Sequence, residues 1–339
     1  MVERIRKAGA YTGGDVHVNT GLTEISVAYK QRQVNYVANQ VFPGVPVQKQ
    51  SDKIFKFDKN DLLRNEAGIR APGTKANSGS YAITSTDTYF CDVHSWGHRI
   101  PREYLANSDI SGLEVQGAEY VMQKLMIDRE VDWVTNFFTT NLWADQGTPN
   151  DATGHATTSA WPYFIYFSDQ ANSDPQNTII LGQESIQQNT GYKPRILVAG
   201  LQVHNQLRKH ADLKEQVKYT SSANIGQEYM AQFFDIDKYV VGSSVRATNI
   251  EGGTAAYSFN LGKNMLLVYA PESPGLFTPS GGYIFEWIGL NGLGYDVSIE
   301  SKMDDGAGST KSLIIEGEMA YDAKLLCNDL GVFFSGAVA

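Results

Sequence analysis

The sequence predicts an α+β fold with one long helix, a long two-stranded hairpin and a compact unit in which strands and helices alternate. Three observations predict it. Apolar residues recur at helical spacing over residues 113–139, strand-like alternation marks residues 51–92, and short apolar strands alternate with helices over residues 192–289. The chain has 339 residues, which is enough to bury a sizeable core.

The first 50 residues show no sustained hydrophobic period. Pro43 and Pro46 keep residues 41–47 out of a helix and favour an extended chain. Such an arm cannot form a core of its own, so we expect it to pack on the body of this chain or on a neighbouring copy.

Residues 51–92 are predicted to form the long hairpin. Phe55 and Phe57 alternate with charged residues, which is typical of a half-exposed strand. A polar tip spans residues 65–80, and the return strand occupies residues 81–91. Because an isolated two-stranded hairpin is marginally stable in water, we expect a partner surface to cover one this long.

The clearest helix is predicted for residues 113–139. Ser111 and Glu114 have the spacing of a capping box, in which two side chains satisfy backbone amides at the start of a helix. Apolar residues then recur at three- and four-residue intervals: Ala118, Val121, Met122, Leu125, Val131, Val134, Phe138 and Leu142. At ~1.5 Å per residue this helix would be ~40 Å long. We interpret it as a structural spine.

The compact unit follows a second helix, for which Asp174 is the expected N-cap and which should end near Gly191. Strands are then predicted at residues 195–200, 239–241 and 265–269, and helices at residues 201–210 and 227–234, the last capped by Asn224. The final 50 residues return to strands, with period-two alternation around residues 295–299 and 313–321.

Composition and charge argue against several classes of protein. No apolar run approaches the ~18 residues of a membrane span, and no signal-peptide pattern follows the basic N-terminus. Two cysteines, Cys91 and Cys327, are too few for a disulfide scaffold. With 28 Lys and Arg against 37 Asp and Glu, the net charge of −9 argues against duplex DNA binding as the main function.

No sequence motif predicts a catalytic, cofactor-binding or metal-binding residue. Cys91, His94 and His98 are residue types that bind zinc, but no second Cys/His pair lies near them in the sequence. Residues 289–294 contain spaced glycines but precede a strand, whereas phosphate-binding glycines precede a helix. We therefore expect no catalytic residue, no metal and no cofactor.

Two groups of polar residues are interpreted as solvent-exposed faces. His204 and His210 lie in a short helix that also carries two basic residues, and a solvated face is the expected environment. Glu316 and Glu318 share one face of a predicted strand because side chains alternate, and that face is expected to be exposed.

Several segments, in the same order along the chain, resemble the major capsid proteins of tailed phages. They are residues 36–43, 45–47 and 57–59 at the junction of arm and hairpin, 85–91 and 100–103 at the return of the hairpin, 129–133 with Phe137 and Phe138 in the spine helix, and 194–200 with Lys214 and residues 217–220 in the compact unit. The resemblance runs from about residue 30 to the C-terminus and depends on this order more than on any single string.

The resemblance implies a Hong Kong 97-type fold. Its parts would be an N-terminal arm at residues 1–50, an extended E-loop at 51–97, a peripheral P-domain at 98–191 and 290–339 that contains the spine helix, and an axial A-domain at 192–289. In that family the subunits form hexamers and pentamers that close into an icosahedral head around double-stranded DNA. The E-loop would then lie over a neighbouring subunit and contact it through Lys53, Lys56, Asp58, Lys59, Arg64 and Arg70.

The implied partners are further copies of this chain, a scaffolding protein, a portal protein and a decoration protein. Packaged double-stranded DNA would be contacted without sequence specificity, and no membrane is expected. The implied location is the virion, after synthesis in the host cytoplasm. Some relatives carry a cleaved scaffolding segment before the arm; here the arm begins almost at once, so a separate scaffold or a shed segment is expected.

Three alternatives stay open. An encapsulin-like shell subunit would have the same fold. Another virion component, such as a tail or decoration protein, would form a trimer or a low-order ring. A non-capsid α/β enzyme would need a polar pocket within residues 192–289 and would form a small discrete oligomer. Some relatives also form Lys–Asn isopeptide cross-links between subunits. Lys56, Lys59 or Lys75 could supply the amine and Asn328 the amide, although no motif selects among them.

Overall fold

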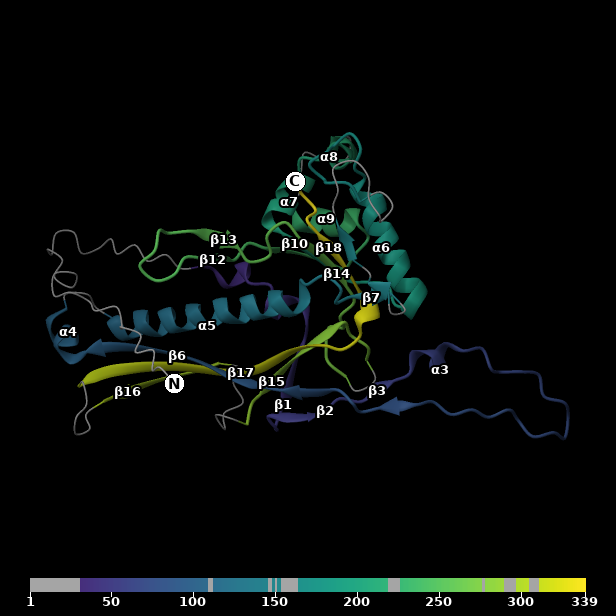
Figure 1. The fold of residues 1–339 in the computed structure, drawn as a ribbon, viewed down its shortest axis with the longest axis horizontal. Coiled ribbons are helices and arrows are strands. Elements are labelled where there is room, and N and C mark those ends of the chain that lie inside the picture. The colour runs from purple at the N-terminus through teal and green to yellow at the C-terminus, as the bar shows by residue number, and fades with distance from the viewer. Residues whose placement is uncertain are drawn as a thin grey trace.

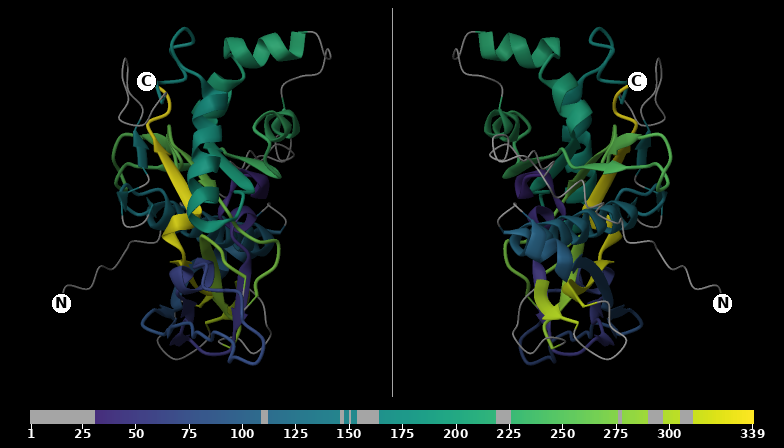
Figure 2. Two further views of the ribbon diagram at one scale, coloured as in Figure 1. Left: turned by 90° about the vertical axis from the view of Figure 1, so that its right-hand side faces the viewer. Right: turned by 90° about the vertical axis from the view of Figure 1, so that its left-hand side faces the viewer.

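The computed structural model describes residues 31–108, 112–145, 148–149, 151–153, 164–218, 226–275, 278–289, 297–304 and 311–339. It shows an elongated molecule in which a sheet and a long helix run side by side, a second sheet with its helices lies above one end, and the long hairpin projects beyond that end (Figure 1). When the molecule is viewed along its long axis, the second sheet and its helices lie above the first sheet (Figure 2).

The first sheet is built around β17, the longest strand. Its strands are β1 Gly44–Val47, β6 Asp92–Pro101, β15 Gly282–Trp287, β16 Val297–Met303 and β17 Ser312–Leu325. The order is β1-β15-β17-β16, and β6 also pairs with β17. All pairs are antiparallel except β1 with β15, which is parallel. The C-terminal strands predicted from period-two alternation are therefore confirmed, and Glu316 lies on the exposed face of β17 as expected.

Helix α5, Leu113–Phe137, packs across this sheet and ends within two residues of the predicted boundary. The approach is close: a Cβ built on Gly317 of β17 would lie 2.6 Å from Val121 Cγ1. The predicted capping box is wrong. The N-cap is Gly112 in the left-handed conformation, without a side-chain hydrogen bond. Ser111 lies outside the described residues.

The second sheet has the order β11-β10-β14-β18-β9. Its strands are β9 Asp151–Thr153, β10 Ile196–Gly200, β11 Lys238–Gly242, β14 Met265–Val268 and β18 Gly331–Ser335, and its helices are α6 Pro175–Thr190, α7 Leu201–Leu207, α8 Ala211–Lys218 and α9 Gln227–Phe233. This α/β unit thus includes β9 and β18, which come from outside residues 192–289. The boundaries of the domains stay a prediction.

The sequence signals for α6 are confirmed by its caps. Asp174 accepts a hydrogen bond from the Asn177 amide, Pro175 occupies the first turn, and Gly191 closes the helix with a positive φ of 78°. Helix α9 differs from expectation, because Gly226 is its N-cap and Asn224 lies outside the described residues.

The long hairpin consists of two short ladders. Strand β2, Ser51–Lys53, pairs with β5, Thr88–Phe90, and β3, Lys56–Phe57, pairs with β4, Ile83–Thr84. Helix α3, Lys59–Leu63, follows β3 along the chain on the way to the tip of the hairpin. The remaining described elements are η1 Gln33–Asn35, α2 Ala38–Val41, α4 Arg102–Asn107, β7 Ala144–Asp145, β8 Thr148–Pro149, β12 Val245–Ala247, β13 Tyr257–Phe259 and η2 Asn328–Leu330. Within the described ranges, no helix is long and apolar enough to span a bilayer.

Candidate functional site: the long hairpin and its anchorage

The base of the long hairpin is fixed to the first sheet by buried aromatic packing. Tyr89 stacks on Phe285 of β15 with a centroid separation of 4.5 Å and an interplanar angle of 11°. Cys91 is fully buried beside them, and its thiol donates to the Phe285 carbonyl. Burial raises the pKa of Cys91 to about 12, so the thiol stays protonated and acts as a packing residue.

Beyond the base, the hairpin carries large apolar side chains that face solvent in the single chain. Ile69 is fully exposed, and the others expose more than half of their surface. They are Phe55, Leu62, Leu63, Ile69, Tyr81 and Ile83. Several large apolar side chains exposed on one projecting segment indicate a contact with another molecule more than a solvated loop. Figure 1 shows the hairpin projecting well away from the rest of the chain.

Two of the six charged residues predicted to contact a neighbour are paired at the base of the hairpin. Lys56 forms an ion pair with Asp87 of the return strand, and Lys59 forms one with Asp329 of η2. The hydrogen bond from Lys56 lowers the pKa of the Asp87 carboxyl. These pairs link the two strands of the hairpin to each other and to the body of the same chain. The predicted contact of Lys56 and Lys59 with a neighbouring subunit stays a prediction.

Two further residues of that set stabilise the short helix of the hairpin. Asp58 caps α3 by accepting from the Asn60 amide at 2.8 Å. Arg64, just past the helix end, pairs with Glu66 at 2.9 Å and with Asp61 at 3.6 Å. Because the ion pairs of Arg64 are exposed to solvent, they contribute little to stability.

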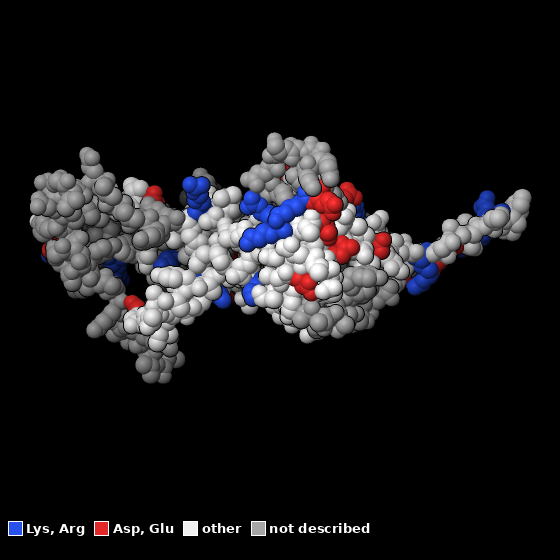
Figure 3. Space-filling model, turned by 90° about the horizontal axis from the view of Figure 1, so that it is seen from above, with Lys and Arg blue, Asp and Glu red and all other residues white. Residues whose placement is uncertain are grey.

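The last two residues of the set, Lys53 and Arg70, are exposed and form no ion pair with any residue that the structure describes. Seen from above, the hairpin carries scattered basic and acidic side chains, and the body beside it shows basic and acidic groups next to each other (Figure 3). Among the six predicted contact charges, Lys53 and Arg70 are therefore the two cations without an ion pair to any residue in the described part of the chain.

A buried carboxylate anchors the arm to the spine helix. Glu130 of α5 is fully buried and accepts hydrogen bonds from the backbone amide of Val37 at 2.9 and 3.1 Å and from that of Ala38 at 3.0 Å. The Ser244 hydroxyl, which precedes β12, donates to the same carboxylate at 3.0 Å. Burial raises the pKa of Glu130, while the three donors oppose that rise because they favour the charged form.

The adjacent Arg129 connects the spine helix to the first sheet. Its side chain is 3% exposed and donates to Glu286 of β15 at 2.7 Å. The guanidinium also lies over the ring of Tyr321 of β17, 5.3 Å from the centroid. Together, Arg129 and Glu130 tie three parts of the chain to α5: the arm, the sheet and the α/β unit.

Known proteins of similar sequence and similar fold were identified by comparison. No protein family model matches the chain. The major capsid protein of Burkholderia phage BcepMu is 24% identical over 330 residues, covering 94% of this chain and 96% of that protein. A phage-related protein from Bordetella bronchiseptica RB50 superposes with a TM-score of 0.68 at 19% identity, covering 91% of this chain and 94% of its own. The capsid of cyanophage P-SCSP1u gives 0.59 at 12% identity, covering 97% and 96%.

Over nearly its whole length the chain is similar to a phage major capsid protein, and its fold is the Hong Kong 97-type fold of phage capsid subunits. The resemblance inferred from the order of its sequence segments is thereby confirmed. The long hairpin corresponds to the expected E-loop and α5 to the expected spine helix.

Arg129 and Glu130 were not among the functional residues predicted from the sequence. A signal was present for Arg129, because it continues a row of four-residue steps through Val121, Leu125, Trp133 and Phe137, all of which are buried. A charge within such a row predicts a buried ion pair. For Glu130 no comparable signal exists, since its partners are backbone amides far away in sequence.

One prediction about the α/β unit was wrong: His204 and His210 are buried. His204 lies on the face of α7 with Val203 and Leu207 and bonds the Tyr239 hydroxyl at 3.2 Å. The basic residues that follow α7 suggested a solvated helix, but the histidines turn inward against the second sheet.

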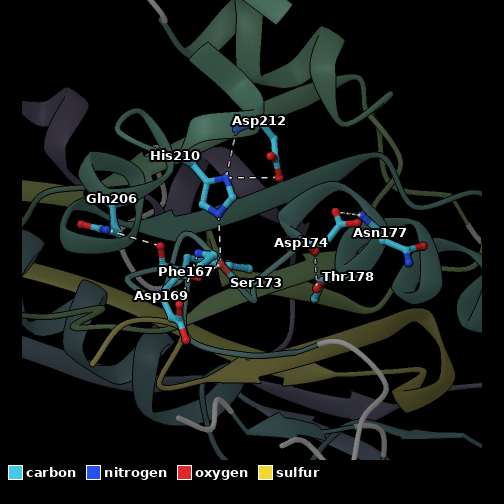
Figure 4. A network of polar contacts seen from close by, with 10 residues as sticks. Phe167, Asp169, Ser173, Asp174, Asn177, Thr178, Gln206, His210 and Asp212 are labelled. Atoms are coloured by element: carbon cyan, nitrogen blue, oxygen red, sulfur yellow. Dashed lines mark hydrogen bonds and ion pairs between the residues drawn. The ribbon is translucent and has the colours of Figure 1, made fainter. Parts of the chain in front are cut away.

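His210 belongs to a buried Ser–His–Asp arrangement in the α/β unit (Figure 4). Its Nε2 lies 3.0 Å from Ser173 Oγ, and its Nδ1 lies 3.4 Å from the Asp212 carboxylate. The Asp212 backbone amide donates to Nδ1, and the Ser173 hydroxyl donates to the Asp169 carbonyl. Nε2 must therefore carry the proton that binds Ser173.

That protonation state is the opposite of the one a nucleophilic serine requires, where Nε2 accepts the serine proton. Ser173 is also only 6% exposed and His210 is fully buried. Burial lowers the pKa of His210 and favours its neutral form. The arrangement therefore acts as a structural network that joins α6 to the segment between α7 and α8.

Cys91, His94 and His98, the residue types that could bind zinc, each contact a different partner. Cys91 bonds the Phe285 carbonyl, His94 pairs with Asp128 at 2.7 Å, and His98 contacts the ring of Tyr120 edge-on. Among the described residues, no group of three or more His, Cys, Asp or Glu could hold a metal ion.

Proposed function

We propose that this capsid protein assembles into hexamers and pentamers that close into the icosahedral head of a tailed phage with a double-stranded DNA genome. The observation that carries the proposal is the long hairpin, whose base is buried against β15 while its apolar side chains are exposed in the single chain. Subunits in a closed ring meet head to tail, so an element that projects from one subunit is covered by the next.

The chemistry of the hairpin supports a contact with a second copy. Covering an exposed Ile or Leu side chain contributes about 1.5–3 kcal/mol, and the hairpin offers six large apolar residues. Lys53 and Arg70, which form no ion pair within the described ranges, are proposed to pair with a neighbour's carboxylates. Lys56, Asp58, Lys59 and Arg64 would contribute by holding the shape of the hairpin.

The domain assignment and the partners are part of the same proposal. The arm at residues 1–50, the E-loop at 51–97, the P-domain at 98–191 and 290–339, and the A-domain at 192–289 are proposed to make separate contacts in the shell. A scaffolding protein, a portal protein and a decoration protein are proposed partners. The net charge of −9 suits a shell that encloses DNA without binding it tightly. The location would be the virion, after synthesis in the host cytoplasm.

The other readings have less support. The curated relative with 96% of its length matched is a phage major capsid protein, which favours a phage head over an encapsulin-like compartment. For an enzyme, the Ser–His–Asp arrangement in the α/β unit has the wrong donor pattern, and its serine is buried.

The test is assembly of purified protein, followed by negative-stain electron microscopy and light scattering. Wild-type chain, expressed with its neighbouring genes, is expected to give closed shells or rings of five and six subunits. Ile69→Asp should prevent assembly, because it places a charge in the covered surface of the hairpin. Ile250→Asp, also at a highly exposed isoleucine but outside the hairpin, is the matched control.

Two results would contradict the proposal. The first is a wild-type protein that stays monomeric or dimeric with and without the neighbouring gene products. The second is normal shell yield for Ile69→Asp, which would show that the hairpin is not covered. Thermal unfolding of the unassembled variants checks that both substitutions leave the subunit folded, as expected for fully solvated positions.

A further inference from the structure

The described part of the arm, from residue 31 onward, occupies only part of one edge of strand β12. Strand β13 covers one edge of β12, where the Asn260 amide donates to the Ser244 carbonyl and the Thr248 amide donates to the Ala256 carbonyl. Backbone groups alternate in direction along a strand, so the odd-numbered residues of β12 present theirs to the opposite edge.

The arm reaches this opposite edge at two places. The Ser243 amide donates to the Asn35 carbonyl at 3.3 Å. Further along, the side-chain amide of Gln31 imitates a neighbouring strand: it accepts from the Val245 amide at 2.9 Å and donates to the Val245 carbonyl at 2.6 Å. As the residue number falls along the arm, it rises along β12, so the two run antiparallel.

The edge then continues without a described partner. By the same alternation, Ala247 presents its N–H and C=O to the edge just beyond Gln31, and no residue in the described ranges bonds to either group. An open strand edge of this kind readily accepts another strand.

A groove runs beside the open edge, between the β12–β13 hairpin, α5 and β6. Its volume is about 1030 Å³, and Gln31 lies at its wall together with Trp96, Val131, Ala247 and Tyr257. The groove is open to solvent and partly apolar. Added backbone at the β12 edge would therefore place alternate side chains next to it.

The sequence that precedes Gln31 has the pattern of such a strand. Ile25, Val27 and Tyr29 alternate with the small residues Ser26 and Ala28. β-branched and aromatic residues favour strands, and a period of two directs the three large side chains to one side.

We propose that residues 25–29 of this same chain add as an antiparallel strand to the open edge of β12, with Ile25, Val27 and Tyr29 in the groove over α5. The side chain of Gln31 stands opposite Val245, which sets Tyr29 opposite Ala247. Tyr29 is two positions before Gln31, with only Lys30 between them. An extended chain advances about 3.3 Å per residue, so the same chain reaches Ala247 without a detour. The inference is independent of shell formation and adds a second anchor for the arm beyond Glu130.

Disulfide trapping tests both the register and the source of the strand. The full-length double variant Tyr29→Cys with Ala247→Cys, made in a Cys327→Ser background, is oxidised and analysed by non-reducing electrophoresis and mass spectrometry. Because a disulfide needs Cα atoms within about 7 Å, we expect an intramolecular bond in at least about fivefold higher yield than for the control pair Val16→Cys with Ala247→Cys. Shell assembly is scored separately by electron microscopy.

Each other outcome overturns the inference. A bond between two chains would assign the groove to a neighbour's arm, equal yields in the two pairs would indicate random encounters, and no bond in either pair would leave the edge uncovered. Hydrogen exchange provides a measurement without cysteines. Val27→Pro removes a strand donor and should accelerate exchange at the Ala247 amide by at least about tenfold, whereas Val16→Pro should not change it.

Discussion

Removing the Glu130 carboxylate should release the arm from the spine helix. The substitution Glu130→Ala leaves the amides of Val37 and Ala38 without an acceptor, and both residues are at most 3% exposed. The Ser244 hydroxyl loses its acceptor as well. Water cannot replace the carboxylate unless the local packing opens, because Val37 and Ala38 are buried in the same apolar cluster as Phe42 and Trp133.

The magnitude follows from the number of donors left unsatisfied. Each buried amide without a partner costs about 1–3 kcal/mol, which puts the two backbone amides at about 3–4 kcal/mol together. Loss of the acceptor for the Ser244 hydroxyl adds a further cost, but removal of the buried carboxylate also removes the cost of its own desolvation. We take these two contributions to the free energy of unfolding as cancelling. We expect a loss of about 3 kcal/mol in the free energy of unfolding.

Urea denaturation of the unassembled subunit measures this loss, with tryptophan fluorescence as the probe because Trp133 is fully buried beside the arm. Glu316→Ala, at an exposed position of β17, is the control and should change the free energy of unfolding by less than about 0.5 kcal/mol. A change below about 1 kcal/mol for Glu130→Ala would refute the reasoning, since it would mean that the arm amides find other acceptors at little cost.

Two further predictions concern the α/β unit. Gly200→Ala would place a Cβ 2.1 Å from the Gly262 carbonyl oxygen, and backbone cannot move aside as a side chain does. We therefore expect a loss of about 3 kcal/mol in the free energy of unfolding, measured by urea denaturation. The control Gly97→Ala, where a Cβ meets open space, should change this free energy by less than about 0.5 kcal/mol. Burial lowers the pKa of His204 to about 4, so the folded state binds fewer protons than the unfolded state below pH ~6.5. The contribution of His204 is therefore complete above pH ~6.5 and falls by about 3 kcal/mol as the pH drops toward 4. His204→Gln, which cannot be protonated, should show a shallower decline of unfolding free energy over this range, and an unchanged slope would contradict the assignment.

The elements that the sequence predicted well are those with a local cause. The 3.6-residue period located α5, and Asp174, Pro175 and Gly191 located α6 because each residue acts within one turn of the helix end. The start of α5 at Leu113 was predicted correctly, but its cap was not, because Gly112 in a left-handed conformation precedes the helix in place of a side-chain cap. Local signals of this kind compete with tertiary packing, and the outcome cannot be read from spacing alone.

The candidate site divides in the same way. Alternation in residues 51–92 predicted a hairpin, and its polar tip predicted exposure. The sequence did not show that Lys59 pairs with Asp329, which is 270 residues away. Likewise, His204 and His210 were interpreted as exposed because they lie near basic residues, while their burial depends on how α7 meets the second sheet. Long-range partners follow from topology, which one sequence specifies only indirectly.

Strand β15 shows why the hairpin, the arm and the spine helix are mechanically linked. Three consecutive residues of this strand each contact a different part: Ile284 faces the parallel strand β1 of the arm, Phe285 stacks on Tyr89 at the base of the hairpin, and Glu286 binds Arg129 of α5. Neighbouring residues of a strand cannot move apart, so a force on the hairpin reaches the arm and the spine helix through a few ångströms of backbone. A change in the angle of the hairpin during assembly must therefore either move all three parts together or bend the hairpin beyond Tyr89, where only short ladders and exposed ion pairs hold its two strands.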